Sequence, residues 1–83
     1  MNTKRTDPIT HPSQLSQLLK GRRKRLGLTQ AQLAAKLTLT QNRLSQIETD
    51  PRGLTLDRLL DLLNVLGLEM KVEDRPVGTK SEW

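Results

Sequence analysis

Three threonines of this 83-residue chain stand directly before short segments whose apolar residues recur at helical spacing. Threonine at such a position caps a helix, because its hydroxyl oxygen accepts a hydrogen bond from a backbone N–H of the first turn. Ser13 stands in the same relation to a first segment that ends at Gly27. The predicted N-caps are Ser13, Thr29, Thr40 and Thr55. The helices after the three threonine caps are expected over 30–37, 41–48 and 56–66. In the helix over 56–66 the periodicity places five leucines toward the core: Leu56, Leu59, Leu60, Leu63 and Leu66.

The period of the apolar residues changes from helical to two after Gly67. Leu68, Met70 and Val72 alternate with charged residues, which predicts one β-strand over 68–73. A lone strand needs a partner, and the same strand of a second copy would give a two-stranded antiparallel ribbon across a dimer axis. A strand packed on its own domain or on another protein is the alternative.

The predicted organisation is therefore an all-α bundle of four to five short helices with one C-terminal strand. We expect a flexible arm over 1–12, the helical domain over 13–67, the strand over 68–73 and a polar tail over 74–83. A domain this small buries only about 60% of its unfolded surface, so a dimer would add needed stability.

Lys and Arg number 14 against nine Asp and Glu, which gives a formal net charge of +5, and five of the six residues from Lys20 to Arg25 are basic. Such a cluster favours a polyanionic partner, although charge can also serve solubility alone. The only aromatic residue is Trp83, so the base-stacking surfaces of single-strand and RNA binders cannot be built. Duplex DNA is the favoured polyanion.

The residues of common enzymes and metal sites are missing from the sequence. There is no cysteine, and the single histidine, His11, has no second candidate ligand nearby. No phosphate-binding glycine loop or paired carboxylates can be recognised. We expect no catalysis, no metal and no cofactor. No membrane span or signal peptide is predicted, so we expect a cytoplasmic, nucleoid-associated protein.

The predicted helix over 41–48 buries little of its surface. Leu44 and Ile47 alone face inward, while the remaining polar residues are left outside. Asn and Gln side chains match the N6 and N7 edge of adenine, and Arg pairs with O6 and N7 of guanine. An ordinary solvated face would more often include Glu and Lys. The candidates for base contacts are Gln41, Asn42, Arg43 and Gln46.

Two short helices joined by a tight turn have the spacing of a helix-turn-helix, whose second helix enters the major groove. The runs RKRLGLTQAQLA (23–34) and TQNRLSQIE (40–48) resemble the XRE family of lambda-repressor-like DNA-binding proteins over about 13–67. The resemblance implies dimeric binding to a palindromic operator, base contacts by the four residues above, and a buried ion pair between Arg23 and Glu48. The family often has Gly in the turn, where this chain has Thr38.

Phosphate contacts are expected around these base contacts. The resemblance assigns one to Gln30, at the start of the second helix. The other residues expected near phosphates are Thr40, Ser45, Arg22, Lys24, Arg25 and Lys36.

The last helix, the predicted strand and a polar tail that ends in Glu82-Trp83 are similar to HipB-type antitoxins. This resemblance implies a strand-mediated dimer, repression of the protein's own operon and a partner that is a HipA-type serine/threonine kinase toxin. It also suggests that Trp83 contacts the kinase. A phage-like or metabolic repressor without a toxin, and an interaction protein that does not bind DNA, are the alternatives.

Overall fold

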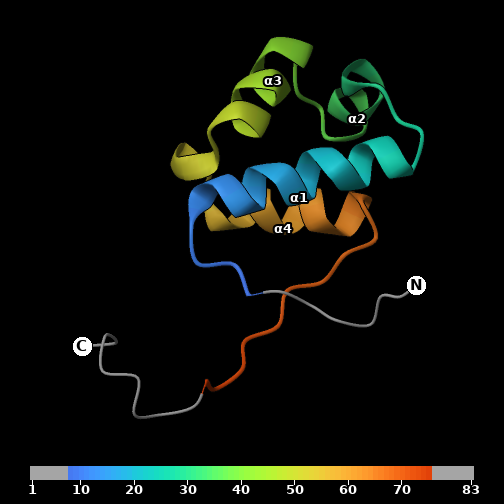
Figure 1. The fold of residues 1–83 in the computed structure, drawn as a ribbon. Coiled ribbons are helices and arrows are strands. Elements are labelled where there is room, and N and C mark those ends of the chain that lie inside the picture. The colour runs from blue at the N-terminus through green and yellow to red at the C-terminus, as the bar shows by residue number, and fades with distance from the viewer. Residues whose placement is uncertain (1–7, 76–83) are drawn as a thin grey trace.

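The computed structural model describes residues 8–75, and within this range every regular element is a helix (Figure 1). The elements are α1 (Pro12–Arg25), α2 (Gln30–Lys36), α3 (Gln41–Thr49), the 3₁₀ helix η1 (Pro51–Gly53) and α4 (Leu56–Val65). α1 crosses the middle of the molecule, with α2 and α3 on one side and α4 on the other (Figure 1). The predicted all-α bundle is confirmed. No helix among these residues is long and apolar enough to span a membrane.

Three of the four predicted N-caps are confirmed. The hydroxyl oxygens of Thr29, Thr40 and Thr55 each accept a hydrogen bond from the backbone N–H three residues later, at 3.0, 3.0 and 3.2 Å. Each hydroxyl thereby satisfies one donor that the first helical turn leaves open.

The cap predicted at Ser13 is wrong, because α1 begins one residue earlier, at Pro12. Proline suits the first helical position, since its φ is already helical and it has no N–H to leave unsatisfied. His11 is the cap: its Nδ1 accepts from the N–H of Ser13 at 3.1 Å, and the Gln14 side chain accepts from the N–H of His11 at 2.9 Å.

The core lies where α1 meets the other helices, and it consists almost entirely of leucine. Its members are Leu19, Leu33, Ala34, Leu37, Leu44, Ile47, Leu62, Leu63 and Leu66. α4 is rotated relative to the prediction, so that Leu62 is buried while Leu56 and Leu60 stay exposed. Leu59, Leu62, Leu63 and Leu66 follow the spacing of a single helix face.

Three helices end in the same way, with a left-handed residue and a hydrogen bond from the next N–H back to the carbonyl five residues earlier. Those bonds run from Leu28 to Arg23, from Leu39 to Ala34 and from Leu68 to Leu63, at 3.1, 2.8 and 2.8 Å. After α1 and α4 the left-handed residue is glycine, Gly27 at φ +75° and Gly67 at φ +72°. After α2, in the turn to α3, it is Thr38 at φ +58°. A left-handed residue with a Cβ costs roughly 1–2 kcal/mol, and β-branching makes Thr38 a rare choice.

Residues 68–75 have no regular secondary structure in this single chain, so the predicted strand over 68–73 is not formed here. Leu68 packs against the core, whereas Met70 is 47% and Val72 is 91% exposed. An isolated strand leaves its backbone groups and its apolar face without partners, so the segment needs a second strand to become regular.

An ion pair between α1 and α3 is buried beside this core. Arg23 donates from Nε to Oε2 of Glu48 at 2.7 Å and from Nη2 to Oε1 at 3.0 Å. Gln30 of α2 donates to the same Oε1 at 3.0 Å, and Arg23 also donates to the carbonyl of Leu28. Glu48 is 2% exposed. The pair therefore ties α1, α2 and α3 to one carboxylate.

Burial disfavours the charged form of Glu48, but hydrogen bonds from Arg23 and Gln30 and the charge of Arg23 outweigh it. The pKa of Glu48 is therefore held below its usual value. A lowered pKa in the folded state stabilises the fold at every pH above the ordinary pKa, and this contribution is lost as the pH falls through the lowered value.

Glu48→Gln should lower the free energy of unfolding by about 3–5 kcal/mol at neutral pH, because Arg23 would stay buried without a counter-charge. Urea unfolding followed by circular dichroism measures the change. The matched control is Glu69→Gln, which removes an exposed carboxylate 3.5 Å from Lys71 and should change stability by no more than about 0.5 kcal/mol. The gap between wild type and Glu48→Gln should shrink only below the ordinary glutamate pKa of about 4.3; a gap of the same size at every pH would contradict the role given to the charge.

Candidate nucleic-acid interface

The four predicted base-contacting residues lie on the outer surface of α3. Gln41, Asn42, Arg43 and Gln46 are all exposed, while Leu44 and Ile47 are buried beneath them. Nη1 of Arg43 lies 3.5 Å from Oε1 of Gln46, one helical turn later. The structure therefore brings amide and guanidinium groups together on one solvent-facing surface, where they can meet the donors and acceptors of base edges.

Gln30 links this outer surface to the buried ion pair. Its Nε2 donates to Glu48, and its Oε1 lies 3.5 Å from Nε2 of Gln41. A chain of polar contacts therefore runs from the fixed Glu48 carboxylate through Gln30 to the amide of Gln41.

Both carboxylates at the end of α3 are paired with arginine. Glu48 is bound to Arg23 in the interior, and Asp50 receives Nε and Nη2 of Arg52 at 2.9 and 2.8 Å. The hydrogen bonds from the side chain and the backbone of Arg52 lower the pKa of Asp50 to about 2. The outer surface of α3 therefore presents one positive charge, Arg43, and no unpaired negative charge to a polyanion.

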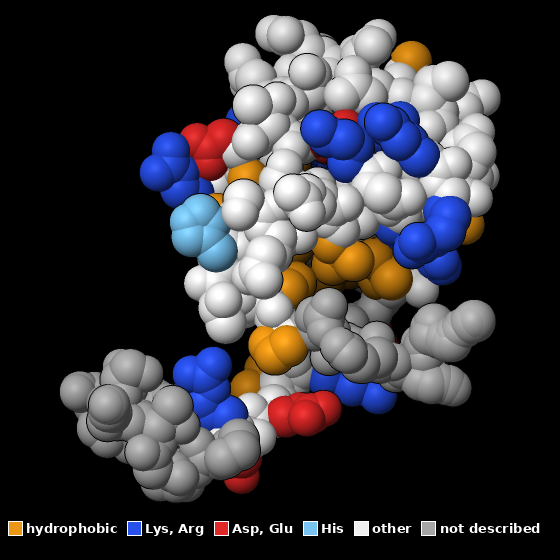
Figure 2. Space-filling view, in the orientation of Figure 1, with side chains coloured by type: hydrophobic (Ala, Val, Ile, Leu, Met, Phe, Trp, Pro, Cys, Tyr) orange, Lys and Arg blue, Asp and Glu red, His pale blue; other side chains and the backbone are white. Residues whose placement is uncertain are grey.

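Lys and Arg side chains gather over α1 on the face shown in Figure 2, below the largely uncharged polar surface of α2 and α3. Among the residues expected near phosphates, Lys24, Arg25 and Lys36 are exposed. Lys20, which the sequence did not assign to phosphate, is exposed on α1, and its positive charge contributes to the lowered pKa of Glu48. The arrangement places a positive field beside the polar surface of α3, as phosphate contacts beside base contacts require.

The other expected phosphate residues differ in their availability. Thr40 is exposed, and its oxygen is used as the cap of α3, which leaves the hydroxyl proton for an anion. Ser45 is half-buried. Arg22 is half-buried, and its Nε donates to the carbonyl of Leu66 at 2.8 Å, at the end of α4. Its expected phosphate contact stays a prediction.

Two polar contacts that hold α3 in place were not expected from the sequence. The hydroxyl of Ser16 donates to the carbonyl of Glu48 and joins α1 to the end of α3. Nη1 of Arg58 on α4 donates to the carbonyl of Leu37 at 3.1 Å, in the turn before α3. Both residues look like ordinary polar positions in the sequence, and only the packing of the helices selects their partners.

The remaining expectations concern the ends of the chain and metal binding. Trp83 lies outside the described residues, as do residues 1–7 of the expected arm and 76–83 of the expected tail. Residues 8–75 contain no group of three or more metal-ligating side chains.

Comparison with known proteins identifies the arrangement. The model of the helix-turn-helix family matches residues 19–72. A solved structure described as an MDT protein and a complex of HipA and HipB with O2–O3 are each 32% identical to this chain, with a TM-score of 0.77. Each match covers 86% of this chain and all of the other. A HipB complex with O1–O2 is 33% identical at a TM-score of 0.75, and that match covers 83% of this chain and all of the other.

No curated protein sequence matches the chain. The family model covers the two helices, the turn and the ion pair described above, and the HipB structures share the fold over most of the chain. The chain therefore belongs to the XRE-type helix-turn-helix family and is similar to HipB antitoxins.

Proposed function

We propose that this protein is a transcriptional repressor that binds an inverted-repeat operator as a dimer and is the antitoxin of a HipA-type kinase. The observation that carries the DNA-binding part is the surface of α3, with four exposed amide and guanidinium side chains and no unpaired carboxylate. The similar HipB structures, one with O1–O2 and one with HipA and O2–O3, support the same two partners for this chain.

In the proposed complex α3 enters the major groove, where Gln41, Asn42, Arg43 and Gln46 contact base edges. The phosphate contacts come from polar residues of α2 and α3 and from lysine and arginine of α1 and α2. The proposed phosphate-contacting residues are Gln30, Thr40, Ser45, Arg22, Lys24, Arg25 and Lys36. Two copies of α3 related by a two-fold axis lie one DNA turn apart, roughly 34 Å, and so recognise two half-sites.

The dimer is proposed to form through residues 68–73 of two copies. Met70 and Val72 are exposed apolar residues on a segment without secondary structure in the single chain. Pairing with an identical segment would satisfy the backbone groups and bury both side chains, and an antiparallel arrangement has the required two-fold symmetry.

Gln41→Ala should weaken binding to the operator by about 1–3 kcal/mol and reduce discrimination at one base pair of each half-site. The probe is duplex DNA from the region upstream of the protein's own gene, and competition with variants of each base pair measures discrimination. The matched control, Asn64→Ala, removes an exposed amide on α4 and should leave both quantities unchanged. Equal loss of affinity for operator and scrambled DNA would contradict base contact by Gln41.

Val72→Gln should raise the dissociation constant of the dimer at least about tenfold, because each dimer loses two buried apolar side chains. Sedimentation equilibrium measures the change. Lys71→Gln is the control, since a strand turns adjacent side chains to opposite faces. A dimer that is unaffected by Val72→Gln, or weakened equally by both changes, would place the dimer interface elsewhere.

Trp83→Ala should abolish retention of the kinase by the tagged full-length protein, because large aromatic side chains anchor interfaces. Purification from the native organism followed by mass spectrometry identifies the partners, and Ser81→Ala is the control. Retention of the same kinase by both variants would exclude Trp83 as the contact. If the wild-type protein retains DNA but no kinase, the chain is a repressor without a toxin, and the antitoxin role is refuted.

A further inference from the structure

The turn between α2 and α3 contains the one non-glycine residue with positive φ among residues 8–75, Thr38. The same cap at the ends of α1 and α4 has glycine at this position. Thr38 cannot relieve its conformation by moving, because its neighbours are fixed. The N–H of Leu39 donates to Ala34 at 2.8 Å, and Thr40 caps α3. Some other contact must therefore stabilise this turn against its strain.

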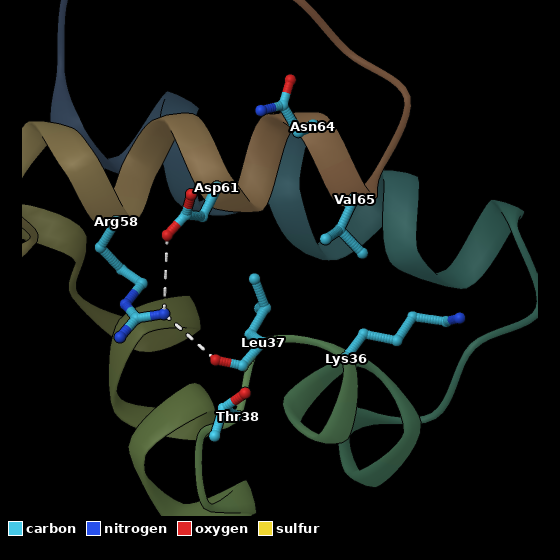
Figure 3. Close-up of a pocket in the computed structure, with 7 residues that line it drawn as sticks. All are labelled: Lys36, Leu37, Thr38, Arg58, Asp61, Asn64 and Val65. Carbon is cyan, nitrogen blue, oxygen red and sulfur yellow. Dashed lines mark hydrogen bonds and ion pairs between the residues drawn. The ribbon is translucent and has the colours of Figure 1, made fainter.

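Arg58 provides a contact of that kind. Its Nη1 donates to the carbonyl of Leu37, the residue directly before Thr38, at 3.1 Å, and lies 3.8 Å from Asp61 one helical turn later. Figure 3 shows that the contacts to the Asp61 carboxylate and to the Leu37 carbonyl meet at the same nitrogen of Arg58, while the amino group of Lys36 points away from it. These residues line an open hollow of about 480 Å³ between the turn and α4.

The bond is well suited to hold the turn. A hydrogen bond from a charged donor is stronger than one between neutral groups, and carbonyls at a helix end have no partner within the helix. In the described part of the chain, no other hydrogen bond joins α4 to α2 or to the turn. The same Nη1 lies 3.8 Å from Asp61, too far for a hydrogen bond, so the bond to Leu37 does not depend on that carboxylate.

We propose that Arg58 is a positioning residue for operator recognition, which compensates for the absence of glycine in the turn. Its hydrogen bond to the Leu37 carbonyl stabilises the left-handed conformation of Thr38. The conformation of this turn then sets the angle between α2 and α3. Arg58 does not itself contact DNA in this proposal. The proposal rests on the proposed DNA-binding function.

The test compares Arg58→Ala in two backgrounds, the natural chain and Thr38→Gly. With Thr38 present, Arg58→Ala should weaken operator binding about tenfold and change binding to scrambled duplex less than about twofold. With glycine in the turn, the strain is absent, so Arg58→Ala should cost less than about threefold. Asp61→Asn, which leaves the bond to Leu37 in place, should cost less than about twofold, and Arg58→Lys should recover part of the loss.

Two further readouts separate positioning from other roles of Arg58. The slope of log affinity against log salt should stay unchanged in Arg58→Ala, whereas a phosphate contact would reduce it by about 0.9 for each protomer. Amide hydrogen exchange should accelerate about tenfold at Leu39, with no change at Leu68, which makes the same bond at the end of α4.

Equal losses in both backgrounds, a reduced salt slope, or unchanged exchange at Leu39 would each overturn the proposal. Wild-type protein that binds neither duplex would refute the proposed function instead. In that case exchange at Leu39 in the two backgrounds still decides whether Arg58 holds the turn: acceleration that disappears with Thr38→Gly supports it, and no acceleration overturns it.

Discussion

The ion pair between Arg23 and Glu48 is the interaction on which the rest of the structure depends. It places a charged carboxylate in a leucine core, which is tolerated only because Arg23 and Gln30 satisfy both of its oxygens. One carboxylate thereby fixes the relative positions of α1, α2 and α3. The same contact removes the negative charge of α3 from its surface. Stability of the fold and suitability of α3 for a polyanion therefore have a common physical origin.

The helix-turn-helix is held from both ends of α2. At its start, Gln30 connects the ion pair to Gln41 on the exposed surface. At its end, the turn contains Thr38 in a conformation that favours glycine, and Arg58 of α4 donates to the carbonyl before it. α4 thus contacts the helix-turn-helix through a polar bond as well as through the core.

Much of this arrangement could be predicted from the sequence, because it depends on local rules. Threonine caps, apolar spacing and the exposed polar face of α3 each involve residues within one or two helical turns. The cap of α1 was missed because Pro12 at the first helical position outweighed Ser13. The partners of Arg22 and Arg58 lie 44 and 21 residues away, so they follow only from helix packing. The strand predicted over 68–73 is not formed in the single chain, because alternation along a sequence does not supply the neighbouring strand that a β-strand needs.

Sequence-specific recognition by α3 is best measured by selecting duplex DNA from a random pool with the full-length protein, because this selection assumes no operator in advance. We expect enrichment of one inverted repeat whose half-sites are centred about one helical turn, 10–10.5 base pairs, apart. A Gln41→Ala protein should select the same spacing with a relaxed preference at one position in each half-site. Recovery of duplexes with no common sequence by the wild-type protein would contradict sequence-specific recognition by α3.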